Sequence, residues 1–169
     1  MTPFSRRIEI LPASQDQMPI LANLLQLYIH DFTEFVDLDT EPDGRFSYPH
    51  LPCYWSEPDR HPFLVKLKGK LAGFVLVKKE SGSPPFWDMA EFFILRKYRR
   101  QGIGTRVAQE VWGLFPGQWQ VRVMSSNTPG NHFWSRAVSG FTGEPVHPAC
   151  NEKNGASWHV FSFQSKPKP

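Results

Sequence analysis

The sequence predicts an α/β or α+β fold with a mixed β-sheet, and three observations lead to this prediction. The apolar run MAEFFIL at residues 89–95 suits a central strand, with one charge inside it at Glu91. Two windows, residues 18–29 and 102–115, place their apolar side chains at helical spacing. Apolar segments on either side of Lys68-Gly69-Lys70 are typical of an antiparallel hairpin.

The predicted helices carry start and stop signals. Ser14 with Gln17 three residues later resembles a capping box, and Pro19 falls near the first turn, where proline is tolerated. Pro116-Gly117 ends the second helix. The expected order is a strand at 8–11, a helix after Ser14, a hairpin of 63–67 and 71–77, strands at 89–95 and 119–124 around the helix at 102–115, a helix at 131–138 and a strand at 158–163.

Length and composition predict one domain, residues 1–169, with a core of its own. No apolar run approaches the ~20 residues that span a bilayer, so no membrane partner is expected. The stretch Met1 to Glu9 has no apolar core of an export signal, and we expect a cytoplasmic location. Cys53 and Cys150 stand outside any Cys/His cluster, so no metal site is expected.

Charge is concentrated in two places, although the net charge is only +3. Residues 31–43 hold six acidic side chains and no basic one, whereas RKYRRQGIGTR at 96–106 holds five basic ones around two glycines. The basic segment is open to three interpretations: a nucleic-acid patch, a solvated helix end or a phosphate site. We place nucleic-acid binding last, because the chain has no recognisable recognition module.

The glycines lie between a predicted strand and the start of a helix. A helix N-terminus offers unpaired N–H groups, and glycine lets an anion approach the backbone, so this position favours phosphate. The dinucleotide fingerprint fails because Val107 stands where a third glycine is needed. A P-loop fails because no Lys-Ser/Thr pair follows.

Arg99-Arg100-Gln101-Gly102-Ile103-Gly104 matches Arg/Gln-x-x-Gly-x-Gly/Ala and resembles the acetyl-CoA-binding motif of the GNAT N-acetyltransferase superfamily. The resemblance covers MAEFFILRKYRRQGIGTRVAQEVW, WQVRVM and NTPGNHFW and ends at Gly140-Phe141. It implies a mostly antiparallel sheet of about 6–7 strands flanked by helices, with a splayed strand pair at the cofactor site. It also implies acetyl-CoA as the cofactor.

The resemblance further implies how the cofactor is held. The backbone near Ile94 pairs with the pantetheine arm, and Asn127 bonds the same arm. Trp134 occupies the position of a tyrosine general acid; an indole N–H cannot serve as that acid, so we place Trp134 among the cofactor-binding residues only. Charge comes from Arg99, Arg100 and Arg106. The pyrophosphate is expected on the backbone N–H groups of Gln101, Gly102, Ile103, Gly104 and Thr105.

Acetyl transfer to an amine needs a base that makes the nucleophile neutral. Glu91 is the leading candidate, because a carboxylate inside an apolar strand can have a raised pKa. Asp88 is the second candidate. The spacing of three places the two on opposite faces of a regular strand, so only one of them is expected to face the amine.

In this fold the first helix and the loop after it commonly form the acceptor wall, here Tyr28, Asp31, Phe32 and Glu34. The acidic run would favour a cationic small molecule or peptide. The predicted function is acetyl transfer from acetyl-CoA to a primary amine. The alternative is a CoA-binding regulatory or interaction domain with weak or no turnover, which Trp134 keeps open. The oligomeric state is undetermined, with a homodimer among the alternatives.

Overall fold

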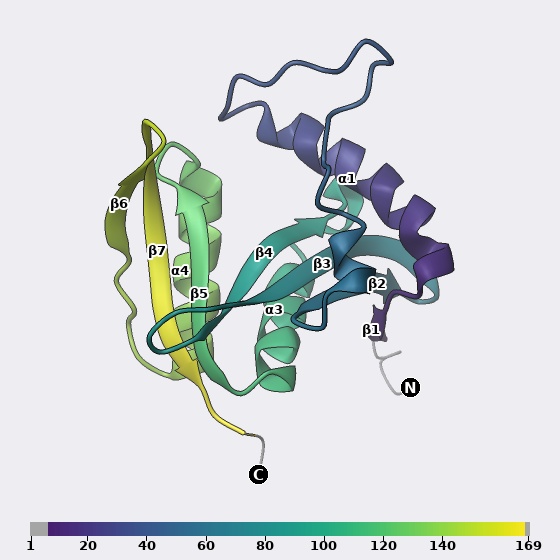
Figure 1. Cartoon of the computed structure of the whole chain (residues 1–169). Helices are drawn as coiled ribbons and strands as arrows, with labels where there is room; N and C mark the ends of the chain where they lie inside the picture. Colours follow the sequence, from purple (N-terminus) through teal and green to yellow (C-terminus); the bar gives the residue numbers. More distant parts are fainter. Residues whose placement is uncertain (1–6, 168–169) are drawn as a thin grey trace.

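Seven strands form a single sheet in the structure, a computed structural model that describes residues 7–167. Of the stretch Met1 to Glu9, residues 1–6 lie outside the described part. The strands are β1 (Ile8–Pro12), β2 (Arg60–Leu67), β3 (Lys70–Glu80), β4 (Phe86–Ile94), β5 (Gly117–Met124), β6 (Ala149–Lys153) and β7 (Ala156–Ser165). Their order is β1-β2-β3-β4-β5-β7-β6, and every neighbouring pair is antiparallel except β4 and β5 (Figure 1).

Helices cover both faces of the sheet, and the alternation of β3 shows which helices cover which face. Phe74 and Leu76 pack with residues of α1 and α2, whereas Val75 and Val77 pack with residues of α3 and α4. Both sets are fully buried. The helices are α1 (Met18–Phe32), α2 (Cys53–Ser56), α3 (Ile103–Leu114) and α4 (Thr128–Thr142), with short 3₁₀ turns η1 (Gln15–Gln17) and η2 (Arg96–Tyr98).

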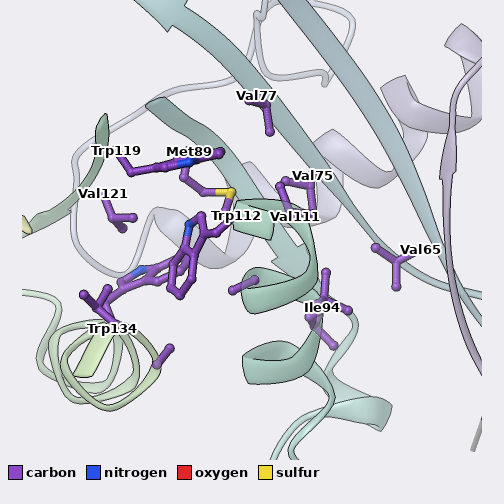
Figure 2. Packing of buried hydrophobic residues seen from close by; sticks show 14 of the residues in the cluster. Val65, Val75, Val77, Met89, Ile94, Val111, Trp112, Trp119, Val121 and Trp134 are labelled. Carbon is purple, nitrogen blue, oxygen red and sulfur yellow. The ribbon is translucent and has the colours of Figure 1, made fainter. Parts of the chain in front are cut away.

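The core on the α3 and α4 side is rich in large aromatic side chains. Trp112 of α3 and Trp119 of β5 are fully buried, and Trp134 of α4 is nearly so. Figure 2 shows these three indoles gathered with Met89 between the sheet and the helices. Because aromatic side chains bury large areas, this cluster fixes where α3 and α4 lie against the sheet.

The parallel pair β4 and β5 separates soon after it forms. Among the described residues its register holds only Trp87 opposite Trp119 and Asp88 opposite Gln120. Beyond these pairs β4 continues to Ile94 and β5 to Met124, and Figure 1 shows the two ribbons diverging. The predicted splayed pair is therefore present, and β4 has an edge toward β5 with no strand partner along residues 89–94 of the described chain.

A β-bulge in β4 changes which side chains share a face. Leu76 of β3 lies opposite Glu91, but the next residue, Val77, lies opposite Met89, so Ala90 is an extra residue. Asp88 lies opposite Lys78, two positions from Leu76 on β3, and so Asp88 and Glu91 point to the same face of the sheet, the α1 side. The expectation of opposite faces was wrong because it assumed a regular strand.

Three elements differ from the sequence-based expectation. Helix α4 starts at Thr128 rather than at residue 131, because the Asn127 side chain accepts a bond from the Gly130 N–H at 2.9 Å and Pro129 fits the first turn. Strand β6 was not predicted: all five of its residues are exposed, so it lacks the alternation that marks a half-buried strand. The short helix α2 was not predicted either, because the expected order has no element between the helix after Ser14 and the hairpin strand at 63–67.

Gly73 of β3 lies opposite Ile94, at the end of β4. A Cβ added there would overlap the carbonyl oxygen of Phe93. We expect Gly73→Ala to lower the free energy of unfolding by about 1–3 kcal/mol, the usual effect of overpacking. Urea unfolding measures it. Gly140→Ala, a helical position whose nearest neighbour is a flexible Gln109 side chain, is the control and should be neutral or stabilising; equal effects would contradict the steric account.

Candidate active site

A cavity of about 380 Å³ lies where β4 and β5 separate. Helix α1 and the loop after it form one wall of the cavity. Residues of α4 and of strand β7 also line the cavity. Among the described residues that line it, the charged side chains are Glu91 of β4 and Arg122 of β5. Its aromatic lining consists of Tyr28, Phe32, Tyr48, Phe92, Trp134 and Trp158.

Glu91 faces this cavity between two tyrosines. The hydroxyl of Tyr48 donates to Glu91 Oε1 at 3.1 Å. Burial raises the pKa of Glu91, while the nearby Tyr28 and Tyr48 hydroxyls act in the opposite sense because they stabilise the charged carboxylate. The pKa values of both tyrosines are raised, first by burial and next by the negative charge of Glu91. The phenols therefore stay protonated and act as donors.

Asp88 occupies a different environment from Glu91. It is fully buried and does not line the cavity, and its Oδ2 accepts a bond from Arg122 Nη2 at 2.6 Å. Burial raises the pKa of Asp88, and the guanidinium opposes this effect. Asp88 Oδ1 is buried without a partner among the described residues. Asp88 thus holds Arg122 in place and lies outside the cavity lining.

Residues 99–104, which we call the glycine corner, follow β4 and join η2 to α3. Arg100 and Gly102 adopt positive φ angles of 58° and 76°, and Gly102 is the N-cap of α3. In the described chain no side chain caps this helix, so its first N–H groups face outward unbonded by a cap. A Cβ on Gly104 would come within 3.2 Å of the Phe133 ring, so this glycine lets the first turn of α3 approach α4.

Arg99 turns away from the glycine corner. Its Nε donates to the carbonyl oxygen of Ile94 at 2.6 Å, and its Nη2 donates to Asp31 Oδ2 at 2.7 Å. Arg96 bonds the other oxygen of Asp31 at 2.5 Å. Partial burial acts to raise the pKa of Asp31, but the bonds from Arg99 and Arg96 outweigh it and the pKa is lowered. These ion pairs join the end of α1 to the loop before α3.

The structure brings some of the predicted acceptor residues together and not others. Tyr28 and Phe32 line the cavity. Asp31 is engaged by the two arginines, and Glu34 is exposed on a shallow hollow formed by residues 33–38, away from the cavity lining. Of the predicted cofactor residues, Asn127 and Trp134 line the cavity, and Ile94 ends β4 beside Gly104.

Sequence reasoning missed Arg122 as a site residue. The signal was available, because WQVRVM alternates and places Arg122 on the face opposite Val121 and Val123. Trp158 was missed as well, since it lies on β7 and reaches the cavity only through the sheet order.

The fold and the site together define a class of protein. A splayed parallel pair leaves a strand edge free for an extended ligand, a helix N-terminus with glycines stands beside it, and a carboxylate with a raised pKa faces the opening. This combination is that of a group-transfer enzyme with a long, phosphate-bearing cofactor.

The comparisons with known proteins agree with this class of enzyme. The model of the acetyltransferase (GNAT) family matches residues 21–141. An acetyltransferase from Thermus thermophilus superposes with a TM-score of 0.64 at 17% identity, over 94% of this chain and 97% of the other. A GNAT-family acetyltransferase from Streptococcus pneumoniae gives 0.58 at 16% over 94% and 99%, and one from Elizabethkingia anophelis with acetyl-CoA bound gives 0.62 at 14% over 94% and 98%. A search of the curated proteins found no match.

This chain belongs to the acetyltransferase (GNAT) family. It is an N-acetyltransferase that takes its acetyl group from acetyl-CoA, and the predicted family, fold class, enzyme class and cofactor are confirmed. Within residues 7–167, no helix has the length and apolar character needed to cross a membrane. The same residues contain no cluster of three or more His, Cys, Asp or Glu side chains suited to a metal.

The Asp31 ion pairs should stabilise the fold in a pH-dependent way. A carboxyl whose pKa is lowered by folding contributes stability above its unfolded pKa of about 3.9, and this stability is lost as pH falls through the folded pKa. We therefore expect Asp31→Asn to unfold at lower urea concentration than wild type at pH 6, with the difference shrinking below about pH 3. The exposed Glu34→Gln is the control; a difference independent of pH would contradict the ion-pair account.

Proposed function

We propose that this enzyme acetylates a primary amine bound in the cavity between α1, β4 and β5, with Glu91 as the general base. The observation that carries the proposal is the position of Glu91: it lies just beyond the last β4–β5 pair, faces the cavity, and has a pKa raised by burial. A base with a raised pKa accepts a proton from an ammonium group more readily at neutral pH.

The described residues fit acetyl-CoA, which when bound supplies an acetyl group on a thioester. The free edge of β4 along residues 89–94 suits an extended pantetheine arm, since its backbone groups lack a strand partner. The N–H groups of residues 101–105 would hold the pyrophosphate at the uncapped start of α3. We assign the arm to this edge together with Asn127 and Trp134, which line the cavity.

The three arginines around the glycines have different roles in this proposal. Arg99 is held by Ile94 and Asp31, so in this proposal it positions the end of β4 and does not reach the phosphates. Arg106 bonds Glu110 at 2.9 Å on α3. Arg100 is exposed beside Gly102, and we assign it the charge that meets the pyrophosphate.

The reaction needs one proton removed from the amine, and a proton donor for the leaving thiolate would speed it further. Glu91 removes a proton from the amine, and the Tyr48 hydroxyl holds the carboxylate in place at 3.1 Å. Trp134 offers no proton to a leaving thiolate, because its indole N–H is not acidic. The thiolate of a thiol whose pKa is about 8.5 can leave without such a donor, although it leaves more slowly than with one.

The preference for a cationic acceptor stays a prediction, with less support than the sequence suggested. It rested on the acidic run at residues 31–43, in which Asp31, at the end of α1, is bound by two arginines and Glu34 stands outside the cavity lining. The alternative, a CoA-binding domain with weak or no turnover, depends on Trp134. Thiol release distinguishes the two functions.

Replacing Glu91 by Gln keeps the shape of the side chain and removes the base. With acetyl-CoA and an active amine from a panel of amines, amino acids, aminoglycosides and basic peptides, we expect kcat/KM to fall by about 10²–10⁴-fold, the usual contribution of a general base. Thiol release measures it. Glu34→Gln is the matched control. Turnover of Glu91→Gln equal to wild type would show that Glu91 is not the base, and acetyl-CoA binding without release across the panel would favour the binding domain.

Tyr48→Phe tests the hydrogen bond to Glu91. Because this bond stabilises the charged carboxylate, its loss should raise the pKa of Glu91 further. The base works only when deprotonated, so the acidic limb of the pH profile of kcat/KM should move to higher pH in Tyr48→Phe and disappear in Glu91→Gln. Profiles that coincide in wild type and Tyr48→Phe would contradict this role.

A further inference from the structure

Arg122 stands on the opposite side of the opening from Glu91. The last paired positions of the splayed strands are Asp88 and Gln120. Counting from this pair along the α1-side face, the next residue on β5 is Arg122, and the bulge at Ala90 makes Glu91 the next on β4. The two charged side chains therefore flank the mouth of the same cavity, and both line it.

Arg122 is anchored at one end only. Its Nη2 bonds the fully buried Asp88 at 2.6 Å, while 39% of its side chain is exposed. Among the described residues it forms no ion pair with Glu91. A guanidinium carries five N–H donors in a rigid fork, so donors remain for a ligand after one is used by Asp88. The buried carboxylate restrains the direction of the fork and so lowers the entropy cost of ordering it on binding.

The lining of the cavity thus presents an acceptor for an amine proton on one side and donors for an anion on the other. The aromatic walls supply the apolar contact between them. The volume of about 380 Å³ is near the lower end of ligand sites, which run from about 300 Å³, and must also hold the acetyl end of the cofactor. An acceptor that fills it is therefore small.

We propose, on the basis of the amine-acetylating function above, that the acceptor is a small amine bearing a carboxylate, such as an α-amino acid with an apolar side chain, and that Arg122 binds the carboxylate. A planar carboxylate matches the guanidinium fork, and charge-assisted bonds of this kind are the strong class. The amine then lies toward Glu91, across the opening.

Matched acceptors test the proposal with the wild-type enzyme. We would compare L-phenylalanine, L-phenylalaninamide and 2-phenylethylamine, and L-methionine with L-methioninamide, by thiol release from acetyl-CoA. We expect each free acid to exceed its amide in kcat/KM by about 10- to 100-fold, the effect of one or two hydrogen bonds to a charged group. Amides or simple amines that react as well as the acids would overturn the proposal while leaving the amine-acetylating function intact.

Three variants test whether Arg122 causes the preference. Arg122→Gln combined with Asp88→Asn removes the fork without leaving a buried charge unpaired, and Asp88→Asn alone is its matched control. Arg122→Lys keeps a cation beside Asp88 but loses the fork. The acid-to-amide ratio of kcat/KM should collapse toward one in the double variant and fall only in part in Arg122→Lys, which loses the fork, and in Asp88→Asn, which keeps the fork but weakens its anchor. A loss of folding would lower both rates together, so the ratio reports on carboxylate binding itself.

Failure of the amine-acetylating function and failure of the Arg122 assignment give different results. If no member of the panel releases thiol, with or without a carboxylate, the amine-acetylating function fails and this proposal with it. If amines react but the double variant keeps the wild-type ratio, only the assignment to Arg122 fails.

Discussion

The early end of pairing between β4 and β5 is the constraint on which the site depends. After Asp88 and Gln120 the two strands share no register in the described chain. Separation of parallel neighbours exposes backbone groups that must find other partners, so it persists only where the surroundings enforce it. The structure shows what does so on each face of the sheet.

On the α3 and α4 side, aromatic side chains occupy the gap. Trp134 of α4 lies with its ring centroid 5.0 Å from that of Phe92 of β4, and Trp112 of α3 stands behind it at 6.2 Å. On the α1 side, the pair of Asp88 and Arg122 spans the two strands at the point where they part. The opening is thus filled with apolar volume on one face and closed at its base by a charged pair on the other.

The parts of this arrangement that are local in sequence could be predicted. Helix periodicity, the Lys68-Gly69 turn and the glycine corner depend on neighbours within a few residues. Glu91 could be singled out because a lone charge inside an apolar run needs an explanation. The bulge at Ala90 could not be predicted, since it depends on how β3 and β4 pair. The partnership of Asp31 with Arg99, 68 residues away, likewise exists only in the folded chain.

Trp134 stands where the family resemblance places a tyrosine, and its surroundings in the structure are those of a packing residue. Trp134 is 8% exposed and packs against Phe92, Phe133 and Trp112, so this position serves chiefly to hold α4 against the splayed strands. A tyrosine would place a hydroxyl there that needs a partner. In the proposed mechanism the proton chemistry therefore lies on the α1 side of the sheet, where Glu91 meets Tyr28 and Tyr48. Because Asp88 and Arg122 occupy that same face, the bulge that turns Glu91 toward α1 also places the proposed base on the face of the sheet that carries Arg122.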